Sequence, residues 1–256
     1  IEKSIDLIGE NKNTNILDGD SDWDEIIVIN SPNVNITGFT ITNSGRNGIL
    51  ISSDNNMHIF DNIFKNNFWS GIVSYESTNI FIENNTFIND GIRITIDEKE
   101  DWDTYTIHNN TVNGKPLRFY HSMNNFTVPS DAGAVIIGNC TNVTIHQLTL
   151  THSSVGITVS YSSNITITSN MILYNGCSGI YIEISSGVHI HQNTLTNNLI
   201  GLYLDRELNR IFIDNNTIQS NYDTGIVMKT IFEEDSTIYI TNNTIIDNSG
   251  GISFYT

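Results

Sequence analysis

Short runs of alternating apolar and polar residues recur along the whole chain. In each run every second residue is apolar, and Gly, Asn or Ser follows within five or six positions. Examples are the pairs Val188 and Ile190, and Ile211 and Ile213. Alternation with period two over so few residues is typical of a β-strand with one buried face. The apolar residues are mostly β-branched or aromatic, which also favours strands over helices.

These runs belong to a block of about 23 residues that repeats along the sequence. The dipeptide Gly-Ile, or a close variant of it, recurs with the same period and serves as a marker of the block. One position of the block, here called the anchor, is Asn in most copies. The anchors are Phe39, Asn62, Asn85, Asn110, Leu148, Asn170, Asn193, Asn216 and Asn243. They lie 23, 23, 25, 38, 22, 23, 23 and 27 residues apart.

A fixed period of roughly 20–50 residues indicates a repeat architecture. A propeller needs about 40 residues for each blade, so the shorter period favours a solenoid. We therefore predict an all-β fold, a single-stranded right-handed parallel β-helix of about ten coils. Residues 1–256 are expected to form one domain.

In such a fold, equivalent residues of successive coils stack about 4.8 Å apart. An Asn at a turn can then pass side-chain amide hydrogen bonds from coil to coil. We predict a structural ladder that consists of Asn62, Asn85, Asn110, Asn170, Asn193, Asn216 and Asn243.

Two features interrupt or end this regularity. The anchors Asn110 and Leu148 lie 38 residues apart, and we interpret residues 113–133 as a lateral insertion. The last residues, 251–254, read as the opening strand of a further coil with no cap. We expect the solenoid to continue in a longer protein or to stack end to end on a neighbouring copy.

The charge of the chain limits the classes of partner that it can bind favourably. The formal net charge is −17, although only 15% of the residues are charged. Nucleic acid and anionic membranes are therefore unfavourable partners, whereas neutral glycans and divalent cations are compatible. No apolar stretch is long enough to predict a membrane span.

We expect an extracellular or cell-surface location. In a protein at such a location, the nine Asn-x-Ser/Thr sequons would carry glycans on exposed turns. The alternative is that an Asn- and Thr-rich repeat produces sequons by chance. The candidate acceptors are Asn35, Asn84, Asn109, Asn125, Asn139, Asn142, Asn164, Asn215 and Asn242.

Two stretches carry a resemblance to a known family. The run Asn113-Gly-Lys-Pro-Leu and the later run Asp131-Ala-Gly-Ala-Val-Ile-Ile-Gly-Asn-Cys resemble NosD-type β-helix proteins. The segment Ile16-Leu-Asp-Gly is similar to the opening coil of pectin-lyase-like proteins. The resemblance implies a right-handed parallel β-helix of the class found in carbohydrate-binding proteins and sugar hydrolases, common in archaeal cell-surface proteins. NosD itself serves copper-site assembly, but this chain has no Met- or Cys-rich copper motif.

The strand that follows each Gly-Ile offers the first candidate site. Register places Glu183 beside Asp205, and Tyr181 beside Tyr203. Two carboxylates about 5 Å apart could act as a retaining-type catalytic pair or hold a cation. The two tyrosines would form a platform for sugars. The same columns add Arg93 and Lys229 as candidate glycan contacts.

Metal sites are a second possibility. Glu83, His108 and His146 are expected on three consecutive coils, where imidazole and carboxylate could bind zinc or copper; solvated surface histidines are the alternative. A calcium loop is suggested by Asp18, Asp20, Asp22 and Asp24, but its twelfth position is Ile29 instead of Glu. No cofactor is required, and Ca²⁺ is a candidate ligand.

Taken together, the residues favour a structural or adhesive module of an envelope, sheath or filament that binds glycans or neighbouring copies. The alternative is a lyase, hydrolase or epimerase that acts on an extracellular polysaccharide through Glu183 and Asp205. The strand motifs of known epimerases, polygalacturonases and pectate lyases are missing from the sequence, which favours the module.

Overall fold

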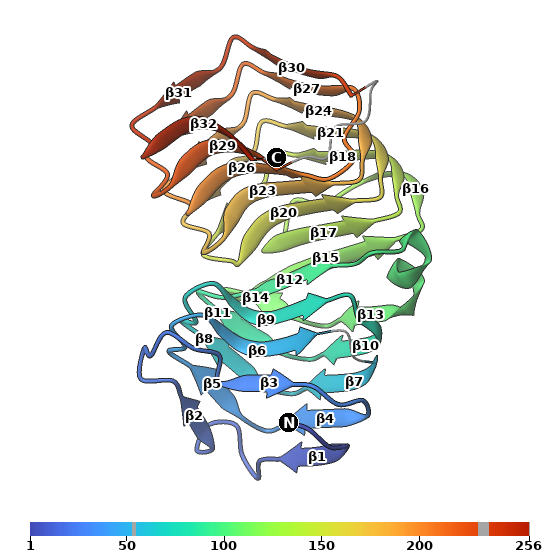
Figure 1. Cartoon of the computed structure of the whole chain (residues 1–256), viewed down its shortest axis with the longest axis vertical. Helices are drawn as coiled ribbons and strands as arrows, with labels where there is room; N and C mark the ends of the chain where they lie inside the picture. The colour runs from blue at the N-terminus through green and yellow to red at the C-terminus, as the bar shows by residue number, and fades with distance from the viewer. Residues whose placement is uncertain (53–54, 230–235, 256) are drawn as a thin grey trace. The chain divides into compact units, whose positions relative to one another are not determined.

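The alternating runs form short parallel strands that stack coil upon coil. A computed structural model describes residues 1–52, 55–229 and 236–255, and nearly all of its regular structure is β-strand (Figure 1). The predicted parallel β-helix is therefore confirmed. Residue contacts divide the chain into two units, Ile1–Phe119 with His152–Ser154, and Tyr120–Thr151 with Val155–Thr256. The boundary between residues 119 and 120 falls inside the predicted insertion, and a single domain stays a prediction.

The first unit carries three sets of parallel strands. One sheet comprises β1 (Ile5–Ile8), β4 (Val34–Thr37), β7 (Asn55–Phe60), β10 (Thr78–Glu83) and β13 (Tyr105–His108). A second comprises β3 (Ile27–Ile29), β6 (Asn47–Ser52), β9 (Ser70–Tyr75) and β12 (Ile92–Thr95). The third set is β2 (Ile16–Asp18), β5 (Thr40–Thr42), β8 (Ile63–Lys65), β11 (Thr86–Ile88) and β14 (Thr111–Val112). A 3₁₀-helix, η1 (Lys99–Thr104), lies between β12 and β13.

The second unit repeats this arrangement. One sheet comprises β16 (Asn124–Thr127), β18 (Thr141–His146), β21 (Ser163–Thr168), β24 (Ser186–His191), β27 (Ile211–Asp214) and β30 (Ile238–Thr241). Another comprises β19 (Thr149–Thr151), β22 (Met171–Leu173), β25 (Thr194–Thr196), β28 (Thr217–Gln219) and β31 (Thr244–Ile246). The third set is β17 (Ala134–Gly138), β20 (Val155–Ser160), β23 (Ser178–Glu183), β26 (Ile200–Asp205), β29 (Thr224–Lys229) and β32 (Gly250–Tyr255).

The core of each unit consists of columns of like apolar side chains. Ile36 lies opposite Ile59 in the register of β4 and β7, and both are fully buried. The rings of Phe64 and Phe87 stack with centroids 5.0 Å apart. The Gly-Ile marker has a steric cause. A Cβ built on Gly179 would lie 2.7 Å from the carbonyl oxygen of the next Gly of the marker, so a larger residue would push the coils apart.

The anchor asparagines form hydrogen-bonded columns in both units. In the first, the Asn85 Oδ1 atom accepts hydrogen bonds from the backbone N–H of Asn62, at 2.9 Å, and from its side-chain amide, at 3.2 Å. The Asn62 amide also donates to the carbonyl of Ile36. Asn110 continues this column, and Asn170, Asn193, Asn216 and Asn243 form the column of the second unit. These buried amides satisfy backbone groups at each turn, where an unpaired group would destabilise the fold.

The backbone conformation at the sequons favours Asn independently of any role in glycosylation. Eight of the nine acceptor asparagines have a positive φ, and only Asn35 does not. Asn tolerates this left-handed region better than most residues because its short polar side chain can hydrogen-bond locally. The four sequons that directly precede an anchor lie at such positions. Glycosylation of the nine sites stays a prediction.

The predicted insertion does not form a lateral flap. Residues 115–121 form β15 (Lys115–His121), whose first residues pair with β14 in an antiparallel direction. The following β16 pairs in parallel with β18, so it is a regular rung of the second unit. Its alternation explains this, because Phe126 occupies the inward position in register with Val143.

A second hydrogen-bonded column lies five residues beyond the anchors. In the second unit it consists of Asn175, Asn198, Asn221 and Asn248. In the first unit Asn67 takes the same place, and the next member is Asp90, which is 2% exposed. The Asp90 carboxylate accepts hydrogen bonds from the Asn67 amide and from the N–H of Gly91. Burial nevertheless raises the pKa of Asp90 from 3.8 to about 7.

We predict that the stability of the protein falls with pH because of Asp90. Its pKa is higher in the folded state, so the stability it contributes is complete below pH 3.8 and is lost as pH rises through about 7. The loss amounts to about 4 kcal/mol. Asp90→Asn should remove this dependence and stabilise the protein at pH 8, as measured by urea unfolding from pH 4 to 8.

The reciprocal control is Asn198→Asp, at the equivalent position of the second unit. It should introduce a loss of stability over a similar pH range. An unchanged pH profile in Asp90→Asn would show that the carboxyl group is not the cause.

Candidate functional site

A buried polar network surrounds Glu183 on the outward face of β20, β23 and β26. The Glu183 carboxylate accepts hydrogen bonds from Ser160 Oγ at 2.9 Å and from the Tyr181 hydroxyl at 2.9 Å. Arg206 Nη2 lies 2.7 Å from Glu183 Oε2 and forms an ion pair with it. The Tyr181 hydroxyl also lies 3.1 Å from Asp205 Oδ2. The register pairs Glu183 with Asp205 and Tyr181 with Tyr203, as expected from the repeat.

Burial keeps Glu183 and Tyr181 from contacting a substrate. Glu183 is fully buried and Tyr181 is only 3% exposed. Burial raises the pKa of Glu183, and the hydrogen bonds from Arg206, Ser160 and Tyr181 oppose that rise. Because both carboxylate oxygens already have partners, Glu183 is not free to act on a substrate in this conformation. Tyr181 cannot form an open platform for a sugar either, and the expected tyrosine pair contributes only Tyr203 to the surface.

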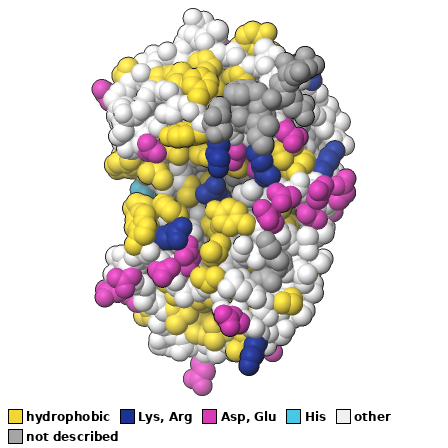
Figure 2. Space-filling view, in the orientation of Figure 1, with side chains coloured by type: hydrophobic (Ala, Val, Ile, Leu, Met, Phe, Trp, Pro, Cys, Tyr) yellow, Lys and Arg dark blue, Asp and Glu magenta, His cyan; other side chains and the backbone are white. Residues whose placement is uncertain are grey.

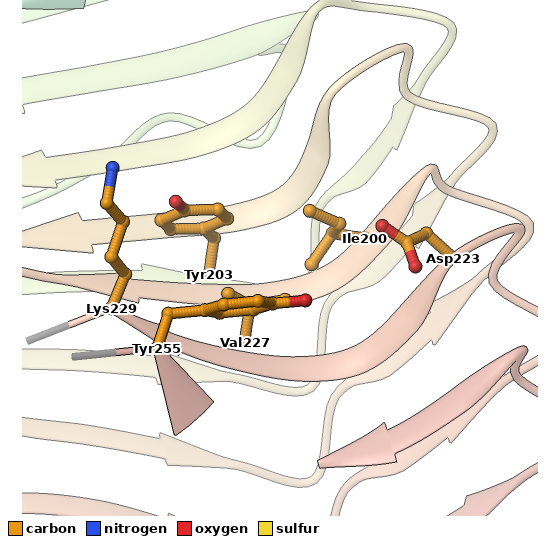
Figure 3. Close-up of a pocket in the computed structure, with 6 residues that line it drawn as sticks. All are labelled: Ile200, Tyr203, Asp223, Val227, Lys229 and Tyr255. Carbon is orange, nitrogen blue, oxygen red and sulfur yellow. The ribbon is translucent and has the colours of Figure 1, made fainter. Parts of the chain in front are cut away.

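The accessible site lies beside this network, on the same face of β26, β29 and β32. A pocket of about 320 Å³ is lined by Ile200, Tyr203, Asp223, Val227, Lys229 and Tyr255. Figure 3 shows Lys229 at one side of the two tyrosine rings, and Ile200 and Asp223 at the other. Tyr203 is half-buried and Tyr255 is 54% exposed.

The pocket follows from the register of three strands. Tyr203 pairs with Val227, which is 3% exposed, while Lys229 pairs with both Asp205 and Tyr255. The two tyrosines lie on strands separated by β29, a distance of roughly 10 Å between backbones. Repeat analysis identified Tyr203 and Lys229 as candidates. It missed Ile200, which begins β26, and Asp223, which precedes β29. The residue type at these places does not recur from coil to coil; Ile200, for example, lies in register with Ser178.

The other predicted glycan contact is elsewhere. Arg93 belongs to β12 in the first unit, where its guanidinium lies 5.8 Å from the ring centre of Tyr75. It does not line the pocket. The predicted columns assume that every coil follows the last one regularly along the chain. Strand β15 interrupts this regularity between Arg93 and the second unit, so their residues do not belong to one column.

The predicted column of metal ligands is formed only in part. Glu83 accepts from His108 Nε2 at 2.7 Å and contacts His58 Nε2 at 3.2 Å. His146 lies on β18, which pairs with β16 and β21, so it does not follow His108 as the next rung. The error arose because the insertion contributes a strand of its own.

The acidic segment at residues 18–24 does not converge on a cation. Asp18 accepts from the backbone N–H of Asp20 at 2.9 Å and from the Asn43 amide. Asp24 accepts from the N–H of Glu25. Within the described ranges no three His, Cys, Asp or Glu side chains are grouped so that they could hold a metal ion. The carboxylates of Asp18 and Asp24 are engaged in these hydrogen bonds, and calcium binding by the segment stays a prediction.

Uncharged polar side chains and backbone cover much of the face in view in Figure 2, beside groups of hydrophobic side chains. The acidic side chains on this face lie in separate groups. No helix within the described part of the chain combines the length and apolar character that crossing a bilayer requires.

These features define a parallel β-helix with a surface pocket beside a buried polar network. Residues 132–256 match the family model of the right-handed β-helix region, and residues 2–130 match that of the periplasmic copper-binding protein NosD. The second match covers half of the chain, so the protein belongs to the NosD family. The periplasmic description of that family agrees with the location outside the cytoplasm that the sequence predicts. No curated protein sequence matches the chain significantly.

Two solved structures are among those to which the chain is similar. The A-module of the mannuronan C-5 epimerase AlgE4 from Azotobacter vinelandii is 13% identical, with a TM-score of 0.37. That comparison covers 98% of this chain and 81% of the module. A mutant of the periplasmic alginate epimerase AlgG is 15% identical, with a TM-score of 0.34, over 87% of this chain and 57% of that one.

The residues of this chain do not fit a copper site. His189 and His191 stack with ring centroids 4.6 Å apart, and His189 Nε2 is bonded to Asp214. The grouping of three donors that a metal would need is missing from the described residues. We therefore assign no step to copper.

We predict that Arg206 is required to keep Glu183 buried. Arg206→Gln removes the counter-ion from a fully buried carboxylate and should destabilise the protein by about 2–4 kcal/mol, somewhat less than for a completely buried pair. Adding Glu183→Gln should restore most of that stability. Urea unfolding of the single and double variants measures both effects, and additive losses would contradict the assignment.

Proposed function

We propose that this protein is a non-catalytic, glycan-binding β-helix module that acts outside the cytoplasm, in an envelope or extracellular layer. The observation that carries the proposal is the pocket of about 320 Å³ between Tyr203 and Tyr255. It combines one half-buried and one exposed aromatic ring, an apolar floor and one charge of each sign.

The chemistry of the pocket suits a sugar ring. Tyr203 and Tyr255 offer flat apolar surfaces with a polar hydroxyl, and Val227 supplies the floor between them. Lys229 can donate hydrogen bonds to hydroxyl groups, and Asp223 can accept them. Sites of this kind are typically apolar with a few well-placed polar groups.

The charge of the protein favours a neutral glycan. A formal net charge of −17 repels polyanions such as uronans over distances of about 8–10 Å at physiological salt. Lys229 is the one cation that lines the pocket within the described residues, and Asp223 opposes its charge.

The enzymatic alternative rests on the Tyr181 hydroxyl, which lies within hydrogen-bonding distance of both Glu183 and Asp205. A shared hydroxyl between two carboxylates is a possible proton relay. However, a general acid or base must reach the group that it protonates, and full burial separates Glu183 from any substrate. The pairing with Arg206 and Ser160 instead gives the network a structural role.

Binding is tested on a glycan array, followed by calorimetry with the oligosaccharide that binds best. Tyr203→Ala and Tyr255→Ala should each weaken binding about tenfold, since each removes a stacking surface. Tyr239→Ala is the matched control, because Tyr239 is 50% exposed but lies on β30, outside the pocket. If all three variants bind with the affinity of the wild type, the pocket is excluded as the binding site.

Catalysis is tested with the same polysaccharide by viscometry, by reducing-end release and by proton NMR for epimerised residues. We expect none of the three signals. Product formation that disappears in Glu183→Gln would overturn the proposal and establish the enzyme.

A further inference from the structure

The first unit carries an exposed aromatic cluster that the pocket does not include. Trp23 lies in the turn between β2 and β3, and Phe68 and Trp69 lie in the turn between β8 and β9. The Trp23 ring is 5.5 Å from that of Phe68 and 5.6 Å from that of Trp69. Trp23 is 66% exposed and Phe68 is 52% exposed.

Backbone hydrogen bonds between three successive turns hold this cluster in place. The N–H of Gly45 donates to Asp22, that of Phe68 to Ser44, and that of Trp69 to Arg46. A Cβ at Gly45 would lie 2.2 Å from the carbonyl oxygen of Asp22, so the turn that carries Trp23 packs closely on a glycine. The rings are therefore presented by a fixed backbone, which lowers the entropy lost when a ligand binds.

A paired cation and anion lie beside the rings. The Arg46 guanidinium is 4.9 Å from the ring centre of Trp69, and its Nε lies 3.5 Å from Glu25 Oε1. The Arg46 side chain is 38% exposed and can donate hydrogen bonds to a ligand. The Glu25 side chain is only 6% exposed and accepts a hydrogen bond from the Asn47 amide, so it holds Arg46 in place and does not face the ligand. A donor at the edge of a stacking surface suits the hydroxyl oxygens of a sugar.

We propose that Trp23, Phe68 and Trp69, with Arg46 held in place by Glu25, form a second saccharide-binding site. The inference rests on the proposed glycan-binding function and extends it to the first unit. The site takes a neutral or amino sugar, because Asp20, Asp22 and Asp24 in the same turn repel uronic acids.

The size of the cluster favours a saccharide over a protein partner. A stable protein interface buries about 800 Å² on each side, whereas one aromatic side chain offers roughly 150–250 Å² when fully covered. Only two of the three rings are largely exposed. The cluster therefore matches one to three sugar units.

The test uses a background from which the pocket has been removed by Tyr203→Ala and Tyr255→Ala. The probes are tetrasaccharides of β-1,4-glucose, β-1,4-mannose and N-acetylglucosamine, titrated by calorimetry and by tryptophan fluorescence. Of the three tryptophans, Trp102 is fully buried and Trp23 is the most exposed, so binding at the cluster should change the emission. At least one probe should bind in this background, and Trp23→Ala should weaken its binding about tenfold.

Phe81→Ala is the matched control, because Phe81 is 41% exposed on β10 of the same unit. Thermal unfolding of each variant checks that the unit is intact. Phe68→Ala removes a second ring of the same site and should also weaken binding.

The outcomes separate the two proposals. If the background binds no probe while the wild type does, the second site is wrong and the pocket stands. If the pocket variants bind as well as the wild type and Trp23→Ala does not, the pocket is wrong and the second site stands. Binding that Trp23→Ala and Phe68→Ala leave unchanged overturns the inference. So does a protein partner that Trp23→Ala releases while no saccharide alters the emission.

Discussion

The structure depends on the hydrogen bonding of buried asparagine amides from one coil to the next. Each anchor Asn in a column accepts from the backbone of the preceding coil and donates to a strand carbonyl, so a turn that leaves its own strand remains fully bonded. A missing amide would leave buried backbone groups unpaired. This requirement fixes the register, and the register decides which outward side chains become neighbours. The second column, with Asn198 and its equivalents, holds the opposite end of the short strand in the same way.

Because the register is fixed, some outward side chains are buried against their neighbours and stabilise the face, whereas others remain exposed to a ligand. Glu183 is stacked against Ser160 and Asp205 and neutralised by Arg206, and it is closed to solvent. One coil further, Tyr203, Val227, Lys229 and Tyr255 line a pocket. A polar residue on a solenoid face is therefore a candidate site only when its column leaves it exposed. The buried network and the pocket lie on the same sheet and share strand β26, yet only the pocket is open to solvent.

The period and the alternation predicted the fold, the anchor column and the pairing of Glu183 with Asp205, because each depends only on spacing. The burial of Tyr181 and Glu183 was not predictable in that way, since it depends on the side chains and loops that cover the face. The insertion was misjudged because β15 reverses direction and β16 adds a rung, which moved His146 out of the expected column. The second asparagine column was missed although its signal is plain, with Asn five residues after most anchors. The cluster around Trp23 arises in turns, where strand periodicity gives no guidance.

The central claim is that the pocket at Tyr203 and Tyr255 holds a glycan while Glu183 stays sealed. The most direct measurement is the electron density of crystals soaked with the oligosaccharide that binds best on the array. The account predicts an intact sugar between the two tyrosine rings, with Lys229 and Asp223 at its edges. A sugar in contact with the Glu183 carboxylate, or density for a cleaved or epimerised product, would contradict it.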